Sequence, residues 1–112
     1  MPDSARSADR RRSLRYDTTI SAVIRTSQGA RHPVVLDDLS EGGCAVTGHY
    51  PLTRGASYRL KINGMETLGS TAAWCEGQAA GLEFQTPLHP AVADHLARLN
   101  PPIALEQEQE DA

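Results

Sequence analysis

The chain has 112 residues, of which 39% are hydrophobic and 4% aromatic, and its formal net charge is −3 at pH 7. This length gives room for one small domain with a thin core of Val, Ile, Leu and Ala side chains. No apolar run approaches the ~18 residues that a membrane-spanning helix needs, and the arginine-rich start lacks the apolar stretch of a signal peptide, so we expect a cytoplasmic protein without membrane insertion.

The charges are divided unevenly along the chain. Residues 1–15 hold five arginines against two aspartates, whereas residues 106–112 hold four acidic residues. A basic arm on an acidic chain predicts one discrete anionic ligand, because DNA or RNA binding normally uses an extended basic face. We expect residues 1–9 to form a disordered arm and residues 101–112 an acidic disordered tail, since neither carries a hydrophobic period.

Short alternating segments separated by Gly-bearing turns follow the arm. Strands are predicted over residues 18–26, 32–39, 44–47, 58–62, 66–75 and 79–84. Asn63 and Gly64 form the dipeptide that most readily adopts the positive φ angles of a two-residue hairpin turn, so a tight hairpin is predicted there. Five to six short strands at roughly ten-residue spacing predict a small antiparallel barrel.

A helix is predicted over residues 90–99, beginning at a proline suited to a first helical turn. Three apolar side chains recur at helical spacing and are expected to cover an open end or seam of the barrel. This stripe consists of Val92, Leu96 and Leu99. Asp94 and Arg98 lie one turn apart on the polar side.

The cysteine, histidine and carboxylate patterns predict neither a metal site nor a catalytic site. Cys44 and Cys75 each lie among apolar neighbours in strand-like segments, which favours buried free thiols over a disulfide. The four histidines show no paired metal-ligand spacing, and no Walker-type loop, Cys-x-x-Cys or carboxylate pair occurs. We therefore expect a binding protein without metal or cofactor and not an enzyme.

Two polar clusters carry the functional signal. Arg11 and Arg15 form Arg-x-x-x-Arg, and Asp38, Ser40 and Gly43 form Asp-x-Ser-x-x-Gly. Alone, the first is typical of a solvated basic leader and the second of a tight turn. In this order and spacing, the pair resembles the signature of the PilZ domain family, bacterial receptors for cyclic di-GMP.

The resemblance covers residues 10–100, the expected PilZ domain. Three further features are similar to the family pattern. They are Pro51-Leu52 with Gly55 ahead of a strand, Trp74 near the end of the next strand, and the segment 81–84, Gly-Leu-Glu-Phe. The resemblance implies an all-β fold, a six-stranded antiparallel β-barrel with a C-terminal α-helix and a flexible N-terminal arm.

The resemblance also implies a cyclic di-GMP site. Arginine suits this ligand because its fork matches phosphate oxygens and guanine O6 and N7, and its plane stacks on bases. Asp38 and Ser40 offer hydrogen bonds to a guanine edge or ribose. The implied binding residues are Arg10, Arg11, Arg12, Arg15, Asp38, Ser40, Gly42, Gly43 and Trp74.

Several of these roles are specific. Arg10, directly before the motif, is associated within the family with binding two intercalated messenger molecules instead of one. Gly42 and Gly43 are expected to let the backbone approach a ligand and turn with positive φ. Trp74 is expected either to pack on a guanine or to belong to the core.

The expected function is a monomeric, single-domain receptor or adaptor. Its arginine arm would become ordered on cyclic di-GMP and signal to a downstream effector protein. One alternative is a PilZ-like interaction scaffold that does not bind nucleotide. A second, a nucleic-acid-binding barrel, is disfavoured because the rest of the chain is acidic and has one lysine.

Overall fold

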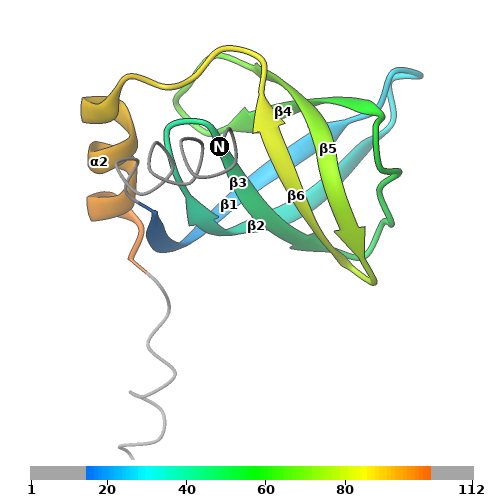
Figure 1. The fold of residues 1–112 in the computed structure, drawn as a ribbon, viewed down its shortest axis with the longest axis horizontal. Coiled ribbons are helices and arrows are strands. Elements are labelled where there is room, and N and C mark those ends of the chain that lie inside the picture. The colour runs from blue at the N-terminus through cyan, green and yellow to red at the C-terminus, as the bar shows by residue number, and fades with distance from the viewer. Residues whose placement is uncertain (1–14, 102–112) are drawn as a thin grey trace, which may run out of the picture.

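The fold is seen in a computed structural model that describes residues 15–101; Arg10, Arg11 and Arg12 lie outside this part of the chain. Six antiparallel strands close into a barrel in the order β1-β2-β3-β6-β5-β4 (Figure 1). The elements are β1 (Tyr16–Arg25), β2 (Arg31–Leu39), β3 (Gly43–Gly48), β4 (Ser57–Ile62), β5 (Leu68–Glu76), β6 (Ala79–Phe84) and α2 (Pro90–Leu99). The predicted barrel with a C-terminal helix is confirmed.

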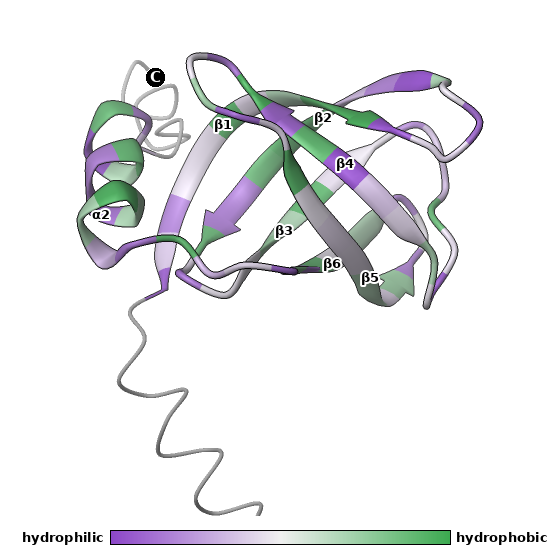
Figure 2. Cartoon of the chain, turned by 90° about the horizontal axis from the view of Figure 1, so that it is seen from above, coloured by the Kyte–Doolittle hydropathy of each residue, from purple (hydrophilic) through white to green (hydrophobic). Residues whose placement is uncertain are grey.

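Alternation along the strands places the core inside the barrel. Successive side chains of a strand point to opposite faces, so Ile20, Ala22 and Ile24 of β1 are buried while their neighbours Ser21 and Val23 face outward. The alternating bands of β4 in Figure 2 follow the same rule. Each fully buried aliphatic side chain stabilises the folded state by about 1.5–3 kcal/mol relative to an exposed one. An aliphatic core can therefore stabilise this barrel although few aromatic residues take part.

Three strands carry irregularities in their register. The pairing shifts between Leu36 and Asp38 in β2 and between Ala72 and Trp74 in β5, and a third shift lies near the start of β1. A bulge adds an unpaired residue, bends its strand and redirects the side chains beside it. The first two bulges flank the residues that form the candidate site.

The expected tight hairpin after β4 is wrong in its geometry. Met65 N donates to Ile62 O at 3.0 Å, which closes a turn, but β5 begins only at Leu68. Gly64 has a φ of 86°, whereas Asn63 does not have a positive φ. A two-residue hairpin turn of the predicted type needs positive φ at both positions, so the connection is longer.

The helix α2 stands at one end of the barrel beside the start of β1 (Figures 1 and 2). Its buried residues are Ala93, Leu96 and Ala97. The predicted stripe was therefore wrong at two of its three positions, because Val92 and Leu99 are exposed. Two alanines allow the helix backbone to approach the barrel closely, which rotates the contact face away from those larger side chains.

The ends of α2 are fixed by local interactions. His89 is the N-cap and its Nδ1 accepts from Ala91 N at 3.0 Å, while Pro90 occupies the first turn as expected. At the other end, Asn100 O accepts from Thr19 N at 3.1 Å. This last bond attaches the helix to β1.

The two cysteines are free, as expected, but differ in exposure: Cys44 is buried and Cys75 only partly so. The described part of the chain contains no helix with the length and apolar character needed to cross a bilayer.

Candidate ligand-binding site

The Asp-x-Ser-x-x-Gly motif forms the turn between β2 and β3. Ser40 N and Ser40 Oγ both donate to Gly43 O, at 2.8 and 3.2 Å. The Ser40 side chain is 7% exposed. The hydroxyl proton thus closes the turn, and only the oxygen lone pairs remain to accept a further hydrogen bond.

Backbone hydrogen bonds join this turn to the segment that leads into α2. Gly42 O accepts from Phe84 N and Glu41 O from Leu88 N, each at 2.8 Å. Two of the turn's carbonyl groups are therefore satisfied by the protein itself. A ligand would meet a preformed turn, which lowers the ordering cost of binding.

The two motif glycines differ in their structural requirement. A Cβ on Gly43 would lie 2.2 Å from Leu82 O, a backbone atom that cannot move aside, whereas a Cβ on Gly42 would meet nothing within 4 Å. Neither glycine has a positive φ, so the expected left-handed turn is wrong. Gly43 is required by the close approach of β3 to β6.

Asp38 and Arg15 form the charged part of the site. Asp38 Oδ1 accepts from Ala45 N at 3.0 Å, and Asp38 Oδ2 lies 3.6 Å from Arg15 Nε. The Arg15 and Asp38 side chains are 60% and 24% exposed. An exposed ion pair of this kind stabilises by about 0–1 kcal/mol, so Arg15 can readily exchange Asp38 for a phosphate.

One row of register partners connects Asp38 to Trp74 across four strands. Asp38 pairs with Ala45 on β3, Ala45 with Gly81 on β6, and Gly81 with Trp74 on β5. With strands about 4.8 Å apart, the row spans about 14 Å. We call it the cross-strand row.

The cross-strand row lies on the outer face of the barrel, since the neighbours of Ala45 on its own strand point into the core. Its two middle residues are small, so they form a low floor between the charged pair and the indole. Trp74 is 43% exposed and its indole covers Gly81, where a Cβ would lie 2.1 Å from Trp74 Nε1. Of the two roles expected for Trp74, the surface position excludes the core one.

Cys44 lies directly beneath this face, with its side chain buried in the core. Burial, assisted by the Asp38 carboxylate and opposed by Arg15, raises the pKa of its thiol to about 12. A protonated thiol is a poor nucleophile and a poor metal ligand. Residues 15–101 contain no group of three His, Cys, Asp or Glu side chains that could hold a metal ion.

The structure thus brings together Arg15, Asp38, Ser40, Gly42 and Gly43, with Trp74 at the far end of the cross-strand row. Arg10, Arg11 and Arg12 lie outside the described residues. Sequence reasoning missed the small floor, although Ala and Gly in outward strand positions hinted at a close approach.

A contact to α2 was also missed. Tyr16, which follows Arg15, has its hydroxyl 3.5 Å from Asp94 Oδ1, and Asp94 Oδ2 accepts from Arg98 Nε at 2.7 Å. Desolvation and the Asp94 carboxylate raise the pKa of the Tyr16 phenol. The pairing of Asp94 with Arg98 was predicted; its connection to the residue beside the motif arginine was not.

Comparison with known proteins agrees with this architecture. The PilZ domain family model matches residues 9–100. Among solved structures, the PilZ domain with c-di-GMP of YcgR from Escherichia coli matches with a TM-score of 0.57 and 17% identity, covering 91% of this chain and 95% of that chain. No curated protein matches the sequence. Because the family model spans most of the chain, including both motifs, this protein belongs to the PilZ domain family.

Proposed function

We propose that the protein is a receptor for cyclic di-GMP, the ligand that accompanies the similar PilZ domain of YcgR. The site would be the outer face of β2, β3, β6 and β5. The observation that supports this most strongly is the cross-strand row. It has an arginine–aspartate pair at one end, an exposed indole at the other and a floor of small residues between them.

Each end of the row suits one part of the ligand. Arg15 is an exposed guanidinium whose fork fits phosphate oxygens and the O6 and N7 edge of guanine. Trp74 offers an aromatic face on which a base can stack. Asp38 has one oxygen occupied by Ala45 N and a second one near Arg15, so it can orient that guanidinium toward the ligand.

The magnitudes are adequate for a messenger receptor. Charge-assisted hydrogen bonds contribute about 1.5–3 kcal/mol each. Three or four of them would therefore give micromolar affinity, about −8 kcal/mol, after the cost of ordering the arm. Arg15 alone is insufficient, so the proposal includes Arg10, Arg11 and Arg12 as further contacts.

The output would be a change of surface. In this scheme the arginine arm closes over the bound messenger in a disorder-to-order step, and a downstream effector protein recognises the new surface. Tyr16 lies next to Arg15 and contacts Asp94, so ordering at Arg15 can also reach α2. Binding is the whole activity, with no covalent step.

Isothermal titration calorimetry tests the receptor function. Wild type should bind cyclic di-GMP with a micromolar Kd, and Arg15→Ala should raise that Kd at least about tenfold, the loss expected for one charge-assisted contact. Arg54→Ala is the matched control, since it removes an exposed arginine outside the row. The stoichiometry reports whether one or two molecules bind.

The alternative is a PilZ scaffold that binds no nucleotide. A folded wild-type chain that shows no heat of binding at ~100 μM messenger, well above the expected Kd, would favour the scaffold and end the receptor proposal.

A further inference from the structure

Three arginines lie next to one another on the outside of β2, β1 and β4. Arg25 is the register partner of both Arg31 and Arg59. Because neighbouring strands are about 4.8 Å apart, the three side chains start within about 10 Å of one another. Lys61, two residues after Arg59, faces the same side. We call the three arginines the arginine row.

The arginine row has no described counter-charge. In the stretch 15–101 the ion pairs join Arg15 to Asp38 and Arg98 to Asp94, and neither involves the row. Like charges directly opposite one another on neighbouring strands are destabilising. Folding alone therefore gains nothing from this arrangement, whereas a bound anion would offset the repulsion.

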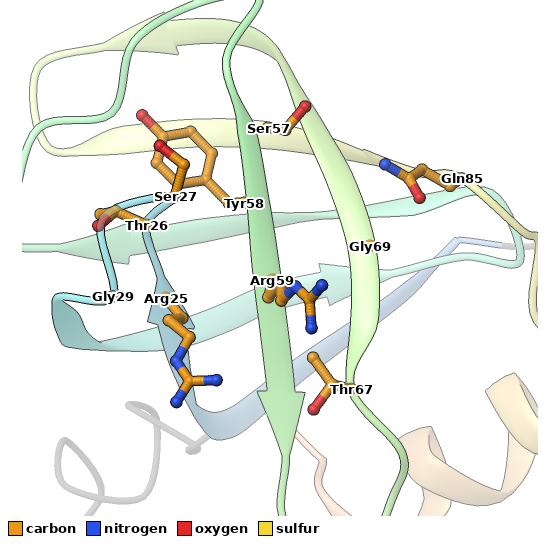
Figure 3. Close-up of a pocket in the computed structure, with 10 residues that line it drawn as sticks. All are labelled: Arg25, Thr26, Ser27, Gly29, Ser57, Tyr58, Arg59, Thr67, Gly69 and Gln85. Carbon is orange, nitrogen blue, oxygen red and sulfur yellow. The ribbon is translucent and has the colours of Figure 1, made fainter.

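Arg25 and Arg59 border a pocket of about 730 Å³ (Figure 3). The volume lies in the range of small-molecule sites. Figure 3 shows the two arginines on neighbouring strands with Thr67 close by. The other side chains that can donate hydrogen bonds here are hydroxyls and one amide, those of Thr26, Ser27, Ser57 and Gln85.

The lining suits a phosphoryl group. Guanidinium forks and hydroxyl donors together match the several oxygens of a phosphoryl group. The pocket has no free aromatic face for a nucleobase, because Tyr58 is buried and its hydroxyl accepts from Thr53 N at 2.8 Å. A pocket of this volume also suits a small molecule better than an extended acidic peptide.

We propose that this pocket is a second anion site, which takes a phosphate-bearing small molecule with at least two neighbouring phosphoryl groups. Arg25 and Arg59 each hold one phosphoryl group, and the hydroxyls complete the contacts. Arg31 and Lys61 border an adjoining groove with the same two arginines. Their charges raise the local anion concentration.

The second site is separate from the proposed messenger site. In the ring order of the strands, β1 and β4 lie opposite β6 and β3. The centres of the arginine row and the cross-strand row therefore lie on opposite sides of the barrel. The two rows share one strand, β2, where Arg31 and Asp38 lie near opposite ends. The inference goes beyond the proposed function and does not depend on it.

Inorganic pyrophosphate is the probe for this site, titrated at constant ionic strength and followed by amide chemical shifts. We expect saturable shifts at Arg25, Ser27, Ser57, Arg59 and Thr67. Arg25→Gln and Arg59→Gln should each weaken binding at least about tenfold, and Arg54→Gln should leave it unchanged. Equal weakening by all three variants, or shifts spread evenly over exposed cations, would overturn the site.

The unfolding midpoint without ligand distinguishes an anion-binding role of the two arginines from a structural one. Because each variant relieves like-charge repulsion, Arg25→Gln and Arg59→Gln should keep or raise the unfolding midpoint. A lower midpoint in both would mean that the arginine row stabilises the fold, and would count against the site.

Competition identifies other occupants. Pyrophosphate affinity should be the same in a chain ending at Pro101 and should exceed that of a hexaglutamate peptide. Tighter binding after truncation would assign the pocket to the acidic tail, and tighter binding of the peptide would assign it to an acidic protein. Either result overturns the proposal.

Cyclic di-GMP separates the two proposals. Saturation with the messenger should leave pyrophosphate binding intact. Loss of pyrophosphate binding would mean that the messenger occupies this pocket, which overturns the second site and the assignment of the first. Pyrophosphate binding in a chain that ignores the messenger would end only the receptor proposal.

Discussion

Gly42 and Gly43 show how adjacent identical residues can have different constraints. Gly43 lies where β3 and β6 approach so closely that a Cβ would overlap the Leu82 carbonyl oxygen, whereas Gly42 faces open space. Because neither φ is positive, the requirement at Gly43 is steric and arises from a neighbouring strand. The backbone conformation of the turn does not require a glycine at position 43.

Gly43→Ala should therefore destabilise the barrel, and Gly42→Ala should not. The overlap at Gly43 forces the two strands apart, which costs about 1–3 kcal/mol. Gly42→Ala should change the free energy of unfolding by less than about 0.5 kcal/mol, as at other unconstrained surface positions. Urea denaturation of both variants measures this, and equal effects would contradict the steric explanation.

Cys44 predicts a specific dependence of stability on pH. Its folded-state thiol has a pKa raised to about 12, whereas an unfolded thiol ionises near 8.5. Between these values the folded state binds more protons, so the thiol's contribution is complete below about pH 8.5 and declines as pH rises toward 12. The decline should be roughly 1 kcal/mol per pH unit.

Unfolding free energies of wild type and Cys44→Ala, measured from pH 7 to 11, isolate this contribution. The difference between the two proteins should be constant below about pH 8 and should fall above about pH 9. A difference that stays constant throughout would show that the buried thiol does not titrate as its surroundings require.

At the scale of elements, α2 shows that helical periodicity alone does not determine which face of a helix is buried. Val92, Leu96 and Leu99 share a spacing compatible with one face, but the barrel end accepts the face formed by Ala93, Leu96 and Ala97. Both faces contain Leu96, so sequence periodicity could not separate them. Shape decided the outcome, because small residues allow the closer approach.

Leu96→Ala should destabilise the protein by about 2–3 kcal/mol, since it removes a buried side chain between α2 and the barrel. Leu99→Ala is the matched control on the same helix. That side chain is 63% exposed, so the change should cost less than about 0.5 kcal/mol. Thermal and urea unfolding would detect the difference between the two variants. Equal losses of stability would support the contact face predicted from the sequence, which includes Leu99.

At the scale of the molecule, barrel closure separates the two proposed sites. The cross-strand row carries one acid and an indole, with Arg15 beside the acid, whereas the arginine row is centred on the opposite side of the barrel. A protein with net charge −3 thus presents a concentrated positive surface away from its proposed messenger site. The net charge alone does not reveal this local concentration of positive charge.

Messenger binding should stabilise the whole barrel. A ligand that binds only the folded state at about 100 times its Kd adds about 2.7 kcal/mol. For a domain of this size, the unfolding midpoint should then rise on the order of 10 °C. Differential scanning fluorimetry with cyclic di-GMP measures this shift. Arg15→Ala at the same concentration should lose about half of it or more, because a Kd raised at least about tenfold lowers the added stability to about 1.4 kcal/mol or less.

Local pattern was enough to identify the strands, the helix and the motif turn. Alternation of Ile20, Ala22 and Ile24, or of Tyr58, Leu60 and Ile62, reflects side-chain geometry within one strand, so neighbours in the chain suffice to predict it. The order and spacing of the two motifs, Arg-x-x-x-Arg at Arg11 and Arg15 and Asp-x-Ser-x-x-Gly at Asp38, Ser40 and Gly43, likewise indicated the family. These features depend on the order and spacing of residues in the chain and do not require knowledge of which strands pair.

Features that join distant segments became clear only in three dimensions. The floor of Ala45 and Gly81, the overlap that requires Gly43 and the arginine row all depend on register between strands. The register follows from the bulges and from closure of the ring, which are settled by packing across the whole barrel. The sequence of one segment does not indicate which residue will face it on the next strand, and this is why the small floor and the arginine row were not predicted.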